Sequence, residues 1–261
     1  MRLLSGDARR AVFAPLDDGS GRSEAVTRRL GSAIALGLIS DGERLPSEND
    51  LATALNVSPM TLREALSDLR RRGLVHTRRG RGGGSFIRVS DAALASLDEL
   101  TTTRLAEVGS ADLRELGDLH AAVAGTAARL AASRASVPEI ARLRDICHRL
   151  ERASTTVEQR RLDGRWFIEL AASAQSVRLA RMEIEVQVEL GQFIWTAGLP
   201  PSDPVAAAAG RLRVMDAIEA REPETARSRT EEQIAADTAR LVDAHLAVIR
   251  RAGPTGGEDA S

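Results

Sequence analysis

The chain has 261 residues, of which 43% are apolar and 28% charged, with 36 basic residues against 37 acidic ones and one cysteine. This length is enough for one large or two modest domains with a buried core. No apolar run approaches the ~18 residues of a membrane span, the first residues lack a secretion signal, and the lone Cys147 excludes an internal disulfide framework. We therefore expect a cytoplasmic protein with no membrane partner.

The charge is distributed unevenly along the chain. Residues 1–90 hold 15 arginines against 10 acidic residues, whereas residues 91–261 hold 21 against 27. A basic front part on an acidic remainder is typical of a nucleic-acid-binding module joined to a sensing or assembly domain. Aromatic residues make up only 2% of the chain, too few for the stacking platforms of single-strand and RNA binders. Double-stranded DNA is therefore the favoured partner.

The first elements follow a polar arm. Residues 1–21 lack periodicity and are expected to be flexible. Apolar residues at four-residue steps from Val26 to Leu38 predict an amphipathic helix over 24–39. Ser47, three residues before Asp50, is the expected N-cap of a second helix with a buried stripe of Leu51, Ala54 and Leu55.

A third helix and a hairpin complete this front module. Ser58-Pro59 is a strong helix start, and Gly73 is the expected helix end. Two strand-like segments, 74–77 and 85–89, flank a run of arginines and glycines. This order of elements predicts a winged helix-turn-helix over residues 22–90.

The rest of the chain shows only helical periodicity. After a linker over 91–108, helices are expected at 111–135, 137–153, 157–175, 177–197, 204–221 and 223–251. Residues 252–261 are expected to form a disordered tail. The predicted fold class is mainly α, with an N-terminal winged helix-turn-helix and a C-terminal all-α helical bundle over 109–251.

The candidate DNA contacts lie at the helix N-termini and in the hairpin. Hydroxyl groups and arginines can bind phosphates or base edges, a methionine can touch a thymine methyl, and glycines permit close backbone approach. The candidates are Ser47, Ser58, Met60, Thr61, Arg63, Arg78, Arg79, Gly80, Arg81 and Gly82. Two other interpretations are a helical packing module with a solvated arginine turn, and a nucleotide-binding phosphate loop at 80–84.

The front module resembles the GntR family of bacterial transcription regulators. The matching residues are Leu45-Pro46-Ser47-Glu48, Leu51-Ala52, Leu55, Val57-Ser58, Thr61 to Leu66, Leu69, Gly73-Leu74-Val75 and Gly80. Asn49 and Pro59 stand where the family usually has basic residues. The resemblance therefore implies DNA binding with an operator sequence that differs from that of the commonest members.

The rear domain resembles the FadR-type branch, which has an FCD effector domain. The matching patterns are Ala127 to Ala132, Asp163 to Ser173, Met215 to Ile218, Pro223 and Ala226. In many such domains an Asp and three His bind a divalent metal that holds a carboxylate effector. Here Asp163 matches the acidic ligand, but the histidine positions hold Phe167, Arg211 and Gln233. We therefore expect no metal and no other cofactor.

The matched positions leave two interpretations open. Arg211 could bind the carboxylate of a small-molecule effector directly, or it could form a salt bridge to Asp163 in a vestigial pocket. The resemblance also makes His120 a candidate effector contact, the alternative being a structural histidine. The candidate effector residues are thus His120, Asp163, Phe167, Arg211 and Gln233.

No catalytic motif is present, so the protein is not expected to be an enzyme. We expect a homodimeric, effector-responsive DNA-binding regulator, a repressor, that reads a palindromic operator. The alternatives are a partner-controlled or constitutive DNA binder with a vestigial pocket, and a helical bundle whose front module no longer binds DNA.

Overall fold

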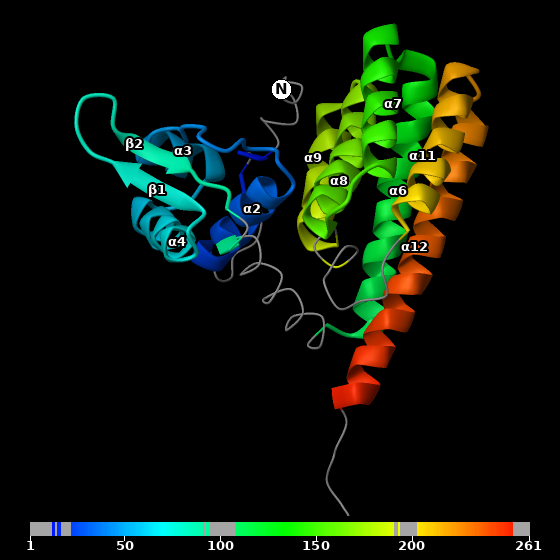
Figure 1. The fold of residues 1–261 in the computed structure, drawn as a ribbon. Coiled ribbons are helices and arrows are strands. Elements are labelled where there is room, and N and C mark those ends of the chain that lie inside the picture. The colour runs from blue at the N-terminus through cyan, green and yellow to red at the C-terminus, as the bar shows by residue number, and fades with distance from the viewer. Residues whose placement is uncertain are drawn as a thin grey trace, which may run out of the picture.

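The computed structural model describes residues 12–13, 15–16, 22–90, 92–93, 108–190, 193 and 203–252. These residues form two parts, which we call the front module (residues 22–90) and the rear bundle (residues 108–252) (Figure 1). The predicted linker over 91–108 and the tail over 252–261 lie almost wholly outside the described residues and stay predictions.

The front module has the predicted order of elements. They are α2 (Arg22–Ala35), α3 (Glu48–Leu55), α4 (Pro59–Arg71), β1 (Val75–Arg78) and β2 (Gly84–Ile87). Ser47 caps α3 by accepting a hydrogen bond from the Asp50 amide (3.2 Å), and Ser58 caps α4 by accepting one from the Thr61 amide (3.1 Å). These caps satisfy backbone donors that have no partner within the helix, which is why both helices begin where the sequence predicts.

The first predicted helix is shorter in the structure than the 24–39 expected. α2 ends at Ala35, Gly37 adopts φ +69°, and the Leu38 amide donates to the Ala33 carbonyl (2.8 Å). Leu38 and Ile39 are nevertheless buried. The apolar pattern continued beyond the helix because it reports burial and not helical backbone.

Two further details correct the sequence-based description. The third member of the buried stripe of α3 is Ala52, and Ala54 is only half-buried. Within the expected flexible arm, Val12 is fully buried and the Leu16 amide donates to the Leu55 carbonyl (3.1 Å). These described positions of the arm are therefore packed onto the front module.

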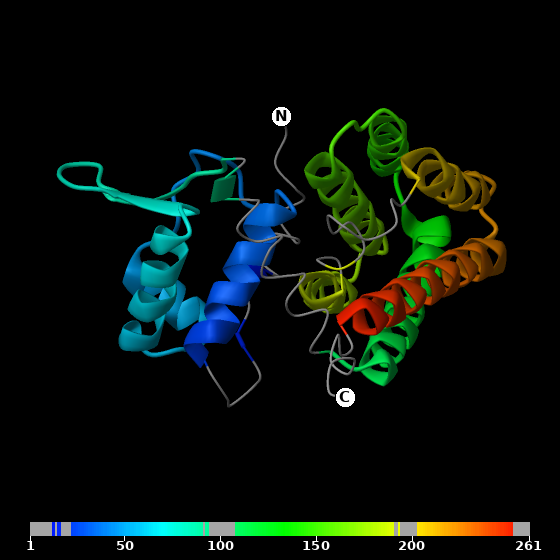
Figure 2. The same cartoon turned by 60° about the horizontal axis from the view of Figure 1, so that its bottom comes forward.

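The two strands form an antiparallel hairpin, with Val75 opposite Ile87 and Arg78 opposite Gly84. Val75 and Ile87 are buried against the module, while β1 beyond Val75 is exposed. The turn between the strands projects away from the rear bundle (Figures 1 and 2).

The rear bundle consists of helices packed around a main apolar core, beside which a smaller apolar cluster includes Leu113, Val186 and Leu241. The helices are α6 (Ser110–Arg134), α7 (Val137–Glu151), α8 (Thr156–Ser173), α9 (Val177–Glu189), α11 (Pro204–Glu219) and α12 (Pro223–Ala252). The long α12 runs along α6, and α11 packs between α7 and α12 (Figure 1). α9 ends at Glu189, whereas the helix predicted from the sequence extends to residue 197. Of the remaining predicted residues, 191–192 and 194–197 lie outside the described part of the chain.

The two parts meet where α2 faces α9 (Figure 2). The apolar core of the front module continues through this contact to Ile184 and Val188 of α9 and Ile168 of α8. Beside it, Arg29 forms an ion pair with Glu185 (3.2 Å).

No helix in the described parts of the chain is long and apolar enough to cross a bilayer.

Candidate DNA-binding surface and effector site

The N-terminus of α4 presents polar groups to solvent. The hydroxyls of Ser58 and Thr61 lie 2.8 Å apart and share one hydrogen bond. Because a hydroxyl carries one proton and two acceptor sites, one of the two protons stays available to a phosphate or a base edge. Met60 is 67% exposed, as an apolar contact to a thymine methyl requires, and Ser47 is exposed at the start of α3.

Arg63 lies one turn into α4, on the face opposite the core. Its side chain is 64% exposed, and its Nε donates to Glu48 Oε2 (3.1 Å). The buried face of the same helix consists of Leu62, Ala65, Leu66 and Leu69. Arg63 is thus free to reach DNA with the two terminal nitrogens of its guanidinium.

The hairpin turn carries the other candidates. All of them are exposed: Arg78, Arg79, Gly80, Arg81 and Gly82. Gly80 and Gly82 have φ of +95° and +85°, a region that favours glycine. A Cβ on Gly83 would lie 2.5 Å from the carbonyl oxygen of Arg78, so the turn is too tight for any side chain there.

The same turn does not fit a nucleotide-binding phosphate loop. Such a loop connects a strand to a helix, whose N-terminus holds the phosphate. Residues 80–84 instead connect two antiparallel strands. An exposed helix N-terminus and a basic, glycine-rich hairpin in one module can together contact a base edge and the backbone of duplex DNA.

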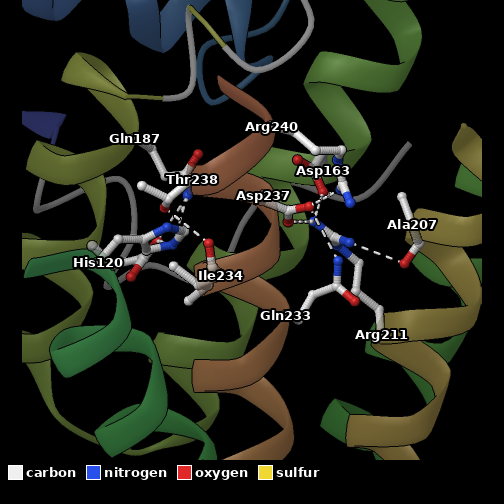
Figure 3. Close-up of polar contacts among 11 residues, drawn as sticks. His120, Asp163, Gln187, Ala207, Arg211, Gln233, Ile234, Asp237, Thr238 and Arg240 are labelled. Carbon is white, nitrogen blue, oxygen red and sulfur yellow. Dashed lines mark hydrogen bonds and ion pairs between the residues drawn. The ribbon is translucent and has the colours of Figure 1, made fainter. Parts of the chain in front are cut away.

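Arg211 is the centre of the candidate effector site (Figure 3). It is 2% exposed, and its Nη2 forms an ion pair with Asp163 of α8 and lies 4.0 Å from Asp237 of α12. Its Nη1 donates to the Ala207 carbonyl (2.9 Å). Of the two arrangements that the sequence left open for Arg211, the structure has the internal ion pair.

Asp237 and Gln233 extend this group along α12. The Gln233 amide donates to Asp237 Oδ1 (3.1 Å), and Gly210 of α11 lies against the Gln233 side chain, so a Cβ at position 210 would displace this amide. Burial raises the pKa of Asp237; the charge of Arg211 opposes this shift and that of Asp163 adds to it. Protonation of Asp237 would weaken its electrostatic attraction to the Arg211 guanidinium.

His120 belongs to a second polar group on the other side of α12 (Figure 3). Its Nε2 lies 3.1 Å from Glu183 Oε1 and 3.3 Å from the Gln187 amide, and this amide also donates to Glu183 (2.9 Å). All three side chains are buried, and Glu183 Oε2 has no hydrogen-bond partner among the described residues.

Phe167 connects the two polar groups. Its ring centre lies 4.5 Å from that of His120 and 5.0 Å from the guanidinium carbon of Arg211. The five residues matched from the sequence therefore lie in one connected network, in which Gln233 is half-buried and the other four are buried. That they bind an effector stays a prediction.

The described residues leave little space beside His120, and the matched positions do not fit a metal. A cavity beside His120 and Asp237 has a volume of about 10 Å³, enough for about one water. The matched positions offer one carboxylate and one amide around a guanidinium, which is no donor set for a divalent transition metal. Within the described ranges, no three His, Cys, Asp or Glu side chains are placed to hold a metal ion.

Four residues in these contacts are not among the candidates predicted from the sequence: Glu48, Glu183, Gln187 and Asp237. A spacing signal existed for three of them. Glu183 and Gln187 are four residues apart, as are Gln233 and Asp237, and this spacing places each pair on one helix face. For Glu48 no local signal existed, because its partner is 15 residues away.

Two family models match the chain. One, described as bacterial regulatory proteins of the gntR family, matches residues 22–84, and the other, described as the FCD domain, matches residues 115–236. The first match covers both helix N-termini and the basic turn, and the second covers the buried network except Asp237.

Three relatives have similar sequences. A Mycobacterium gastri protein named as the HTH-type transcriptional regulator RmpR is 38% identical over 250 residues, 92% of this chain and 89% of that protein. The HTH-type transcriptional regulator Rv0494 of Mycobacterium tuberculosis, named as uncharacterized, is 29% identical over 90% of this chain and 95% of that protein. An Escherichia coli protein named as a fructoselysine utilization operon transcriptional repressor is 42% identical over 62 residues, 24% of this chain and 25% of that protein.

Proposed function

The chain belongs to the GntR family of bacterial regulatory proteins, and we propose that it represses transcription by binding a palindromic operator as a homodimer. Family membership makes the chain a DNA-binding transcriptional regulator with an FCD domain and not an enzyme. Our proposal adds three points to this family membership: the repressor role, the symmetry of the operator and the signal that the rear bundle detects.

One observation carries the proposal for DNA recognition. The N-terminus of α4 is exposed, capped and lined by hydrogen-bonding groups, and Arg63 extends from it into solvent. One such helix reads a short half-site, so a two-fold dimer on a palindrome supplies the length of sequence that specificity needs. The similarity of the front module to a protein named as an operon repressor supports repression.

The test is Arg63→Ala, with Arg114→Ala as a control that removes an exposed arginine from the rear bundle. The wild-type protein is first used to select a preferred duplex from a randomised DNA library. The ratio of its affinities for this duplex and for unselected DNA should fall at least about tenfold in Arg63→Ala. An unchanged ratio, with the thermal midpoint also unchanged, would exclude α4 as the recognition helix.

For the rear bundle, we propose that it detects a small carboxylate-bearing metabolite without a bound metal. The support is Arg211, because a buried guanidinium that already holds Asp163 and Asp237 can exchange one of them for the carboxylate of a ligand. The exchange requires the bundle to open, since the cavity beside His120 admits about one water.

The thermal midpoint of the protein tests this proposal. A ligand that binds only the folded state raises the midpoint, so small carboxylic acids and acyl thioesters are screened with a chelator present. A ligand whose effect survives the chelator supports a metal-free sensor. An effect that appears only on adding zinc or nickel contradicts it.

A second candidate is a regulator that another macromolecule controls, with a vestigial pocket. The observation in its favour is the closed network, in which Arg211 already has an internal partner. This candidate predicts that no ligand in the screen shifts the midpoint, while binding to the selected duplex persists.

A further inference from the structure

An acidic residue lies at the centre of the proposed DNA-binding surface. Glu48 is the first residue of α3, directly after the capping Ser47. Its Oε2 accepts a hydrogen bond from Arg63 Nε (3.1 Å), and its Oε1 lies 3.6 Å from Arg70 Nη2. Both arginines belong to α4, seven residues apart and therefore on one face of it.

The charge of Glu48 is unfavourable for binding DNA. The side chain is 39% exposed at the N-terminus of a helix, a position that would otherwise attract phosphate. A carboxylate there repels the DNA backbone and lowers the affinity for every sequence. A residue that weakens all binding is useful to a sequence-specific binder if it improves the choice among sequences.

The geometry at Arg63 shows how it can do so. Arginine is a long side chain with many rotamers, and a bidentate contact to a guanine edge uses its two terminal nitrogens. Glu48 accepts from Nε, the guanidinium nitrogen nearest the backbone, and no contact among the described residues occupies Nη1 or Nη2. The guanidinium is thereby oriented before DNA arrives.

We propose that Glu48 is a positioning residue that orients Arg63 and thereby increases the discrimination between operator and other DNA, while it lowers the affinity for DNA in general. The inference rests on the proposed role of Arg63 in reading DNA. It assigns specificity to a residue that touches no base.

The experiment compares Glu48→Ala, Glu48→Gln and Asp50→Asn. Glu48→Gln removes the charge but keeps an oxygen that can accept from Arg63 Nε. Asp50→Asn is the matched charge control, because Asp50 is exposed in the same turn of α3 and its carboxylate accepts only from Ser47 among the described hydrogen bonds. For each variant, the affinities for the selected duplex and for unselected DNA are measured across salt concentrations, together with the thermal midpoint.

All three variants should bind unselected DNA more tightly than the wild type, because each removes one negative charge near the phosphates. Glu48→Ala should also lower the ratio of specific to non-specific affinity by about tenfold, the value of one oriented bidentate contact. Glu48→Gln should keep the ratio within about threefold of the wild type, and Asp50→Asn should leave it unchanged. In an Arg63→Ala background, Glu48→Ala should have no further effect on the ratio.

Three results would overturn the inference. The first is a ratio that Glu48→Ala leaves unchanged, and the second is an equal loss in Glu48→Ala and Glu48→Gln. The third is a lower thermal midpoint with both affinities reduced together, which indicates that Glu48 only ties α3 to α4. If the wild type selects no duplex, or Arg63→Ala keeps the ratio, the proposed reading surface itself fails and the inference with it.

Discussion

At the scale of single residues, the rear bundle depends on the charge of Arg211. The guanidinium stands between two buried carboxylates, Asp163 and Asp237, in surroundings that solvate charge poorly. Removing one partner of a buried ion pair leaves charge without compensation, and that loss exceeds what the pair itself contributes.

We therefore expect Arg211→Met to lower the free energy of unfolding by about 3–5 kcal/mol at neutral pH, measured by urea denaturation. The control is Arg240→Met, which removes another partner of Asp237 from a side chain that is 59% exposed. Exposed pairs contribute less than about 1 kcal/mol. Equal effects of the two substitutions would contradict the central role of Arg211.

Cys147 illustrates burial acting on a nucleophile. Its side chain is fully buried, and burial raises the pKa of its thiol to about 12, although the charges of Arg211 and Arg144 oppose the shift. Relative to the reference value of 9.0, the thiolate fraction at pH 8 falls about thousandfold. Iodoacetamide should therefore label the folded protein at pH 8 far more slowly than the protein unfolded in urea, and comparable rates would contradict the burial.

At the scale of elements, the caps determine how well the sequence predicts the helices. Ser47 and Ser58 mark helix starts in the sequence, and the structure has a helix beginning directly after each of them. The end of α2 was placed four residues too late, because Leu38 is buried in a turn by the same apolar packing that buries helical residues. Periodicity therefore located the core better than it located the backbone conformation.

The candidate sites were predictable only where the sequence carries a local pattern. The α4 N-terminus and the hairpin turn follow from capping residues and glycines that are close in sequence. The partner of Arg211 could not be decided, because Asp163 and Asp237 come from two other helices and only their packing determines which oxygens reach the guanidinium. Contacts such as Glu183 with His120, 63 positions apart, depend on tertiary structure in the same way.

Ser58 allows the two roles of a helix N-terminus to be separated. Ser58→Ala removes the acceptor for the Thr61 amide and should lower the free energy of unfolding by about 1 kcal/mol. Ser58→Asp restores a cap and adds a charge that the helix dipole favours, so its stability should match the wild type within a few tenths of a kcal/mol. The affinity of Ser58→Asp for the selected duplex should nevertheless be lower than that of Ser58→Ala, because a carboxylate at this position repels phosphate. Wild-type affinity in Ser58→Asp would mean that this N-terminus does not face DNA.

At the scale of the whole molecule, the front module and the rear bundle share an apolar contact. Ile184 of α9 is fully buried and belongs to the same cluster as Leu30 and Ile34 of α2. At position 164 of α8, a Cβ would lie 2.5 Å from the Leu36 side chain, so Gly164 permits this close approach. α9 therefore packs against the front module on one face, while Glu183 and Gln187 bind His120 inside the bundle.

This contact should join the thermal unfolding of the two parts. We expect the wild type to unfold in one calorimetric transition and Ile184→Ala to divide it in two, because the substitution removes about 2–5 kcal/mol from the shared cluster. Ile218→Ala is the matched control, since Ile218 is equally buried but belongs to the core of the rear bundle alone. It should lower the midpoint without dividing the transition. If both variants keep a single transition, the two parts are joined by contacts other than the one between α2 and α9.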